Sequence, residues 1–193
     1  MRATGVAAVM GAVLVAGCGG GDPRQDAGEP AHTYDVQVVK ASFPVKQTLA
    51  ESVEMRVRVR NTGSQTIPNI AVTLTDDAAS GGFTTRSEQQ GLQDPTKQLW
   101  IVDQAPRGGD TAYVSTWALG PLPAGRTRSF VWHVTPVVPG AHTVRFRVAA
   151  GLNGKARAET KGGDEPGGVF KVDVSRKPPQ GHVDLVSGEV TAS

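Results

Sequence analysis

The chain has 193 residues, of which 38% are hydrophobic and 20% are charged, and this length favours one modest hydrophobic core over two large ones. The formal net charge is +2, so no strong field of one sign draws the chain onto nucleic acid. The single cysteine excludes an intramolecular disulfide and every cysteine-rich zinc motif. The 24 glycines and 13 prolines indicate a folded protein that is rich in loops.

Residues 1–17 have the pattern of a cleaved signal peptide. Met1 and Arg2 form a short positive region, and residues 3–14 form an apolar run with one polar residue. A glycine-rich stretch ends this run well before the about 20 apolar residues that a membrane-spanning helix needs. The pattern therefore favours a signal peptide over a permanent transmembrane helix.

The sequence Val15-Ala16-Gly17-Cys18 ends this segment. It resembles the lipobox of bacterial lipoprotein signal peptides, in which an aliphatic residue and two small residues precede a cysteine. The resemblance implies cleavage after residue 17 and acylation of Cys18, for example with palmitate, and two or more acyl chains hold a protein durably on a membrane. The alternative is an ordinary secretory signal in which Cys18 is a chance thiol.

The chain beyond the signal peptide divides into three parts. Residues 18–33 contain the cysteine and no aromatic or branched aliphatic side chain, a composition that favours a flexible tether. Residues 34–175 are expected to fold as one domain. Residues 176–193 are expected to form a short tail, in which residues 183–186 either stay part of the tail or add an edge strand.

Apolar and polar residues alternate through the predicted domain. In residues 53–60, valines and a methionine alternate with glutamate and arginines, which predicts a strand with one face in a core. Similar alternation predicts strands near residues 34–38, 70–74, 130–134, 144–148 and 170–174. Two further runs, 99–102 and 112–119, are more continuously apolar and suit better-buried strands. Prolines lie between these runs, and only residues 45–52 are free enough of breakers to add a helical turn. About eight strands and no long helix indicate an all-β, antiparallel β-sandwich.

Two stretches resemble the immunoglobulin-like modules of bacterial surface proteins of the CARDB and DUF11 kind. They are VRVRNTGSQTIPNIAVTL at 57–74 and LGPLPAGRTRSFVWHVTPVVPGAHTVRFRVAAG at 119–151. The resemblance lies in an Asn-Thr-Gly turn, a Leu-x-x-Leu-x-x-Gly turn and a Pro-Gly hairpin at Pro139-Gly140, and it implies an immunoglobulin-like sandwich without a particular function. The segments 76–97 and 151–168 exceed ordinary loop lengths, so a specific function is most expected there.

Catalytic and metal-binding patterns are weak. The sequence contains no Gly-x-Ser-x-Gly motif, and its adjacent carboxylates are interpreted as solvated loop acids. The four histidines lack the close spacing of a metal site on one element, although His133 and His142 flank a predicted turn. We therefore expect no catalytic residue, no metal and no cofactor.

Two surfaces are candidates for binding. Trp100 and Trp117 are candidates for exposed rings that stack on sugars, whereas Trp132 is in register with core positions. Arginines on two strands form either solvated faces or basic faces for an acidic polymer. They are Arg56, Arg58 and Arg60 on one strand and Arg145 and Arg147 on another, and an immunoglobulin-like topology places these strands in opposite sheets.

Together these patterns predict a lipid-anchored, non-enzymatic protein of the cell envelope whose immunoglobulin-like module serves adhesion or assembly. Its expected location is the outer face of the cytoplasmic membrane, or the outer membrane where the host has one. The expected partners are the membrane, through the lipid on Cys18, and an envelope protein or polysaccharide, with no nucleic acid. The alternative is a carbohydrate or wall-polymer binding module that uses Trp100, Trp117 and the long loops.

Overall fold

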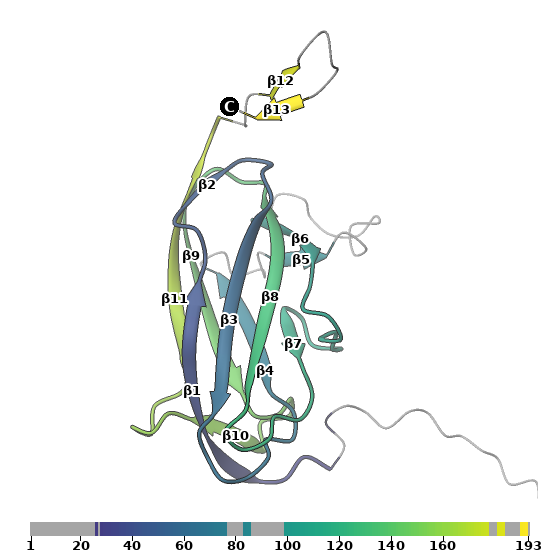
Figure 1. The fold of residues 1–193 in the computed structure, drawn as a ribbon, viewed down its shortest axis with the longest axis vertical. Helices are drawn as coiled ribbons and strands as arrows, with labels where there is room; N and C mark the ends of the chain where they lie inside the picture. The colour runs from purple at the N-terminus through teal and green to yellow at the C-terminus, as the bar shows by residue number, and fades with distance from the viewer. Residues whose placement is uncertain are drawn as a thin grey trace, which may run out of the picture.

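The computed structural model describes residues 26, 28–76, 83–85, 99–177, 181–183 and 190–192, which form strands and turns (Figure 1). The strands are β1 (His32–Ser42), β2 (Lys46–Thr48), β3 (Val53–Asn61), β4 (Ala71–Asp76), β5 (Phe83–Thr85), β6 (Trp100–Gln104), β7 (Thr116–Ala118), β8 (Thr127–Pro136), β9 (Gly140–Ala149), β10 (Ala156–Glu159), β11 (Gly167–Ser175), β12 (Gly181–Val183) and β13 (Val190–Ala192). The described residues include no helix with the length and hydropathy to cross a membrane.

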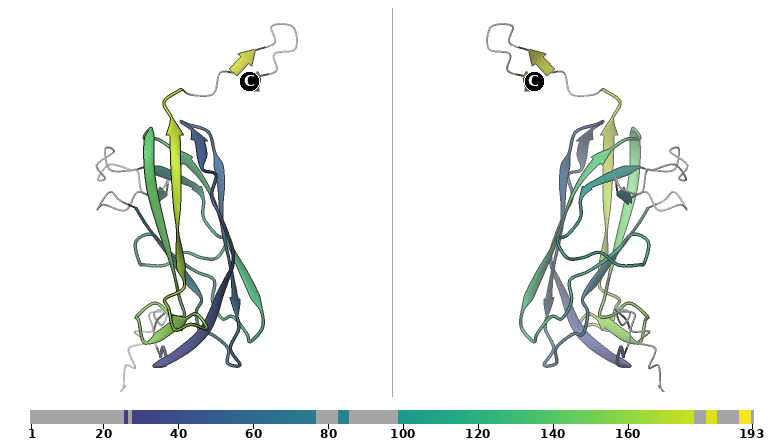
Figure 2. Two further views of the ribbon diagram at one scale, coloured as in Figure 1. Left: turned by 90° about the vertical axis from the view of Figure 1, so that its left-hand side faces the viewer. Right: turned by 90° about the vertical axis from the view of Figure 1, so that its right-hand side faces the viewer.

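Two sheets form the body of the molecule and pack face to face (Figure 2). One has the strand order β10-β1-β3-β8-β6-β5, and the other has the order β2-β11-β9-β4-β7. The immunoglobulin fold places strands A, B, E and D in one sheet and C, F and G in the other. Here β1, β3, β8 and β6 take the first set of places and β4, β9 and β11 take the second, so the predicted immunoglobulin-like β-sandwich is confirmed.

The main ladders are antiparallel, and the short strands account for the exceptions. β10 pairs in parallel with β1, β2 with β11, and β5 with β6. β12 and β13 form a separate antiparallel pair in which Val183 lies opposite Val190. This pair belongs to neither sheet of the sandwich, and residues 184–186 lie outside the described residues.

The core lies between the sheets and follows the alternation in the sequence. Met55, Val57 and Val59 of β3 are fully buried, and they lie opposite β8, whose residues Phe130 and Trp132 are also fully buried. Burial of each large apolar side chain stabilises the fold by about 1.5–3 kcal/mol. Both strands thus hold the sheets together through every second residue.

A buried asparagine joins the Asn-Thr-Gly turn to the Leu-x-x-Leu-x-x-Gly turn. Asn61 is fully buried, and its Nδ2 donates to the carbonyls of Gln65 at 2.7 Å and Leu122 at 2.8 Å. Its Oδ1 accepts the N–H of Gly63 at 3.0 Å. Because main-chain groups of both turns satisfy this side chain, it fixes the position of one turn relative to the other. Both turns lie at the end of the sandwich where β3 ends and β8 begins, which is the lower end in Figure 1 and is called the lower pole below.

The predicted hairpin at Pro139-Gly140 is a connection between the two sheets. Pro136 ends β8 in the six-stranded sheet, and Gly140 begins β9 in the five-stranded sheet. A local Pro-Gly signal specifies a turn but not the partner of the next strand. His133 and His142 consequently belong to different sheets and do not face each other across a hairpin.

Residues 45–52 form β2 and a turn in place of the predicted helical turn. β2 pairs with β11, and the side chain of Gln47 is buried. Its Oε1 accepts the Nε1–H of Trp100 at 2.8 Å, and its Nε2 donates to the carbonyl of Pro44 at 3.0 Å. These contacts between distant segments outweigh the weak helical preference of a short run.

Candidate functional site

The tryptophans are core residues, so the predicted sugar-stacking role of Trp100 and Trp117 is wrong. Their exposed fractions are 0% and 6%. The Trp100 ring stacks on Phe83 with centroids 5.1 Å apart, and Trp117 packs edge-on against Trp132 with centroids 5.5 Å apart. Large rings fill the space between the two sheets and gain more from burial than from a place at the surface.

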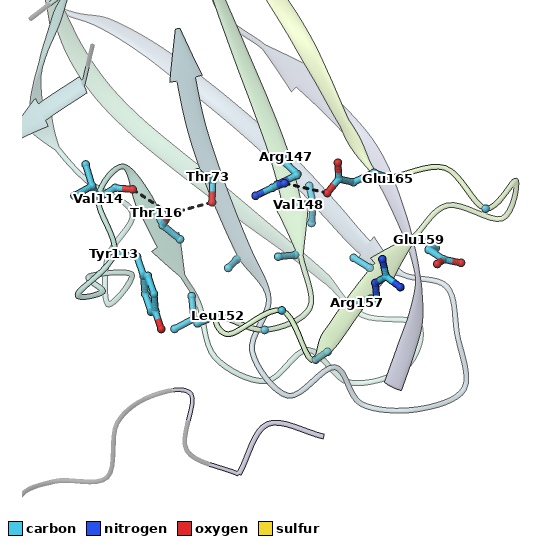
Figure 3. Close-up of a pocket in the computed structure, with 17 residues that line it drawn as sticks. Thr73, Tyr113, Val114, Thr116, Arg147, Val148, Leu152, Arg157, Glu159 and Glu165 are labelled. Atoms are coloured by element: carbon cyan, nitrogen blue, oxygen red, sulfur yellow. Dashed lines mark hydrogen bonds and ion pairs between the residues drawn. The ribbon is translucent and has the colours of Figure 1, made fainter. Parts of the chain in front are cut away.

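A pocket of about 660 Å³ lies at the lower pole, against the five-stranded sheet (Figure 3). Its floor includes residues of β4, β7 and β9, and its wall is the long segment 151–165. The hydroxyls of Thr73 and Thr116 are hydrogen bonded to each other at 2.9 Å. Arg147 forms an ion pair with Glu165 at 3.3 Å. The pocket therefore offers hydroxyl groups and compensated charges, which suit a polar ligand better than an apolar one.

A tight turn holds two apolar side chains at the rim of this pocket. Val114 is 84% exposed and Tyr113 is 44% exposed. The Thr111 hydroxyl donates to the carbonyl of Thr116 at 2.7 Å and accepts the N–H of Tyr113 at 3.1 Å. Ser115 has a φ of +50°, a conformation that non-glycine residues adopt only where their surroundings hold it. The exposed valine is thus presented on a fixed turn.

A carboxylate fastens the N-terminal segment to the same pole. Oε2 of Glu29 accepts the main-chain N–H groups of Leu152 at 2.7 Å and Asn153 at 3.0 Å, and Oε1 accepts that of Ala156 at 2.7 Å. A side chain at Gly151 would occupy the place of this carboxylate. Three charge-assisted hydrogen bonds on one side chain make Glu29 a strong local anchor.

Asp26, the first residue that the structure describes, also contacts this pole. The Tyr113 hydroxyl donates to Oδ2 of Asp26 at 2.9 Å, and Nδ2 of Asn153 donates to its main-chain carbonyl at 3.2 Å. The packed chain therefore starts before residue 34, where the sequence places the domain boundary. Composition misses this because these contacts are made by polar groups, and no motif in residues 26–33 marks them.

The predicted basic faces lie on opposite sheets. Arg56, Arg58 and Arg60 belong to β3 in the six-stranded sheet, whereas Arg145 and Arg147 belong to β9 in the five-stranded sheet. Arg56 is paired with Glu54 at 2.9 Å, which reduces the charge of the first face. The two arginine sets do not combine into one surface.

The remaining candidates form no metal-binding cluster within the described ranges. No three histidine, cysteine, aspartate or glutamate side chains there are grouped to hold a metal ion. Cys18 lies outside the described residues, as do residues 77–82 and 86–98 of the first long segment. The second long segment, 151–168, is the one that builds the wall of the pocket.

Comparisons with solved structures give distant likenesses. No protein-family model matches the chain, and no curated protein matches it. A CARDB domain from Pyrococcus furiosus, solved in complex with di-metal ions, is 16% identical, covers 73% of this chain and 93% of its own, and has a TM-score of 0.44. An α2-macroglobulin from Escherichia coli, solved from domain MG7 to the C-terminus, is 12% identical with a TM-score of 0.44 and covers 82% of this chain. This chain spans 21% of the length of that macroglobulin chain.

Proposed function

We propose that the chain is a lipid-anchored protein of the bacterial envelope whose immunoglobulin-like sandwich is a non-enzymatic adhesion or assembly module. The observation that carries the proposal is the position of Cys18, the single cysteine of the chain, directly after Val15-Ala16-Gly17. The attachment of Asp26 and Glu29 to one pole of the sandwich supports it. An anchor placed there holds the domain by that pole.

The proposed anchor keeps the lower pole close to the membrane. Seven residues, 19–25, separate Cys18 from Asp26, and a flexible linker of this length spans about 15 Å. β1 begins at this pole, and β11 ends at the opposite pole (Figure 1). The upper pole therefore projects away from the bilayer.

The chemistry of the pocket supports binding over catalysis. Its lining includes hydroxyls, arginines and carboxylates but no histidine or cysteine. General acid–base and nucleophilic catalysis require a poised base beside the reacting group. In this pocket the Glu165 carboxylate forms an exposed ion pair with Arg147.

The anchor is tested with the full precursor and its Cys18→Ala variant, expressed in a bacterial host, with Gly20→Ala as a control outside the lipobox. We expect wild type and the control to be processed and to stay with the membrane after a salt wash, because acyl chains do not release in salt. The Cys18→Ala variant should be unprocessed or released. Equal processing and release of all three proteins would contradict the proposal.

A second candidate function, binding of an envelope polysaccharide, is favoured by the pocket of Figure 3. The paired hydroxyls of Thr73 and Thr116 and the partly exposed ring of Tyr113 are groups that bind sugars. A titration of the ¹⁵N-labelled protein with soluble wall oligosaccharides should move the amide signals of these residues. Shifts elsewhere, or none, would remove this candidate.

A further inference from the structure

One strand of the six-stranded sheet is paired on a single side over most of its length. β8 pairs with β3 along residues 127–134, whereas β6 pairs with β8 only along residues 133–136. The β6 ladder shifts register after Val102, and Pro106 follows with no N–H to continue it. No strand in the described ranges lies beside residues 127–132 on this side.

The main-chain groups at this open edge follow from the alternation of an antiparallel strand, in which successive residues direct N–H and C=O to opposite sides. The carbonyl of Arg126 accepts the N–H of Asn61 on the β3 side at 3.0 Å. The N–H of Val137 donates to the carbonyl of Leu99 on the β6 side at 2.9 Å. Odd-numbered residues of β8 therefore face the β6 side, and those at the open edge are Thr127, Ser129 and Val131.

The open edge borders a basic groove. A pocket of about 520 Å³ lies between β8 and the segment 104–108. The charged and titratable side chains that line it are Arg107, Arg128 and His133, with no carboxylate. Neither guanidinium forms an ion pair with a residue in the described part of the chain. The groove thus joins unpaired main-chain donors and acceptors to uncompensated positive charge.

We propose that this groove, formed by residues 104–108 and 127–133, is a docking site for an extended acidic segment of a partner protein. The segment adds a strand beside β8, and its carboxylates lie against Arg107 and Arg128. Main-chain hydrogen bonds provide affinity in such strand addition, and the side chains provide selectivity. An exposed strand edge by itself pairs with strands of many sequences. The positive charge of the groove favours acidic strands among them.

The donors and the acceptors of the open edge together favour a peptide as the ligand. Thr127, Ser129 and Val131 present N–H donors together with C=O acceptors, so a matching ligand supplies acceptors and donors in alternation. A peptide strand does so at the spacing of β8, whereas an ionised phosphate or carboxylate group supplies acceptors alone. The proposal rests on the assembly role proposed above. Its test measures binding in solution, so its result does not depend on whether the protein is lipid-anchored.

The test uses the ¹⁵N-labelled full chain and a blocked peptide in which valine and glutamate alternate, with a lysine-for-glutamate peptide as control. We expect the glutamate peptide to shift the amide signals of Thr127, Ser129 and Val131 and to slow their hydrogen exchange. The lysine peptide should leave them unchanged. Equal binding of both peptides, or shifts confined to other surfaces, would overturn the proposal.

Two variants separate strand addition from simple charge attraction. Ser129→Pro removes a main-chain donor at the open edge. The main-chain groups of residue 129 face away from β3, so the variant keeps its hydrogen bonds to β3 and should fold. Its affinity for the glutamate peptide should fall at least about tenfold. Arg128→Glu should weaken binding by a similar factor, while Lys171→Glu, an exposed charge change on β11, should not.

If Ser129→Pro does not fold, the affinities of Arg128→Glu and Lys171→Glu for the glutamate peptide still decide the outcome. Unchanged affinity in Arg128→Glu would contradict the proposal. Self-association of the free chain that Ser129→Pro abolishes would identify a second copy of this chain as the occupant and overturn the assignment to a separate acidic partner.

Discussion

The interior of the sandwich and its lower pole are held together by different interactions. Between the sheets, apolar side chains of β3 and β8 are buried at every second position. At the pole, Glu29 and Asn61 bind main-chain groups of loops that are distant in the chain. The interior depends on a periodic pattern and tolerates changes of similar volume, whereas the pole depends on single polar atoms with fixed partners.

The largest effect is expected in the interior. Trp132→Ala removes a fully buried ring that packs against Trp117 and Phe130, and such truncations cost about 3–5 kcal/mol. Urea unfolding followed by far-UV circular dichroism measures the free energy of unfolding. The control is Val114→Ala, which changes an 84% exposed side chain and should leave stability within about 0.5 kcal/mol. Similar losses in both variants would contradict the assignment of the core.

A smaller effect is expected at the junction between the interior and the pole. Asn61→Ala leaves the carbonyls of Gln65 and Leu122 and the N–H of Gly63 without their side-chain partner, which costs about 1–3 kcal/mol. The same unfolding measurement tests it, with the exposed neighbour Thr62→Ala as control. Full stability of Asn61→Ala would show that the two turns are held by other contacts.

The smallest effect is expected at the N-terminal segment. Glu29→Gln retains the shape of the side chain but keeps one acceptor oxygen, so at least one of the three N–H groups faces the amide NH2 and the remaining bonds lose the assistance of the charge. Because these bonds are exposed or only part-buried, overall stability should fall by about 1 kcal/mol. Amide exchange at Leu152, Asn153 and Ala156 should quicken several-fold. Glu165→Gln, which alters an ion pair with both partners more than half exposed, should leave these amides unchanged.

Unchanged exchange in Glu29→Gln would mean that the Glu29 carboxylate does not fasten this segment in solution. A general increase in exchange across β3 and β8 would instead assign the Glu29 contacts to the stability of the whole sandwich. Either result would remove the distinction between a cooperative interior and a locally fastened pole.

The part of the fold that follows a period of two could be predicted from the sequence. The alternation at residues 53–60 is long enough to set which side chains point inward, and β3 has that phase. The run at 112–119 reduces to the three residues of β7 because Thr111 closes a turn before it. A run that short does not fix the facing of its tryptophan, so Trp117 and likewise Trp100 could not be placed.

The features of the surface depend on register and on distant contacts. Pro139-Gly140 marks a turn in either a hairpin or a crossover, and the partner strand decides between them. The role of Glu29 depends on three N–H groups more than a hundred residues away. The groove beside β8 exists because β6 leaves the ladder early. None of these leaves a local signal in the sequence.

The most direct test of the proposed function is mass spectrometry of the N-terminal peptide of the mature protein, purified from membranes of a bacterial host. Lipid anchoring predicts a chain that begins at Cys18 and carries the added mass of two or three acyl chains. A chain that begins at another residue, or an unmodified Cys18, would contradict lipid anchoring and return the sandwich to the class of freely secreted modules.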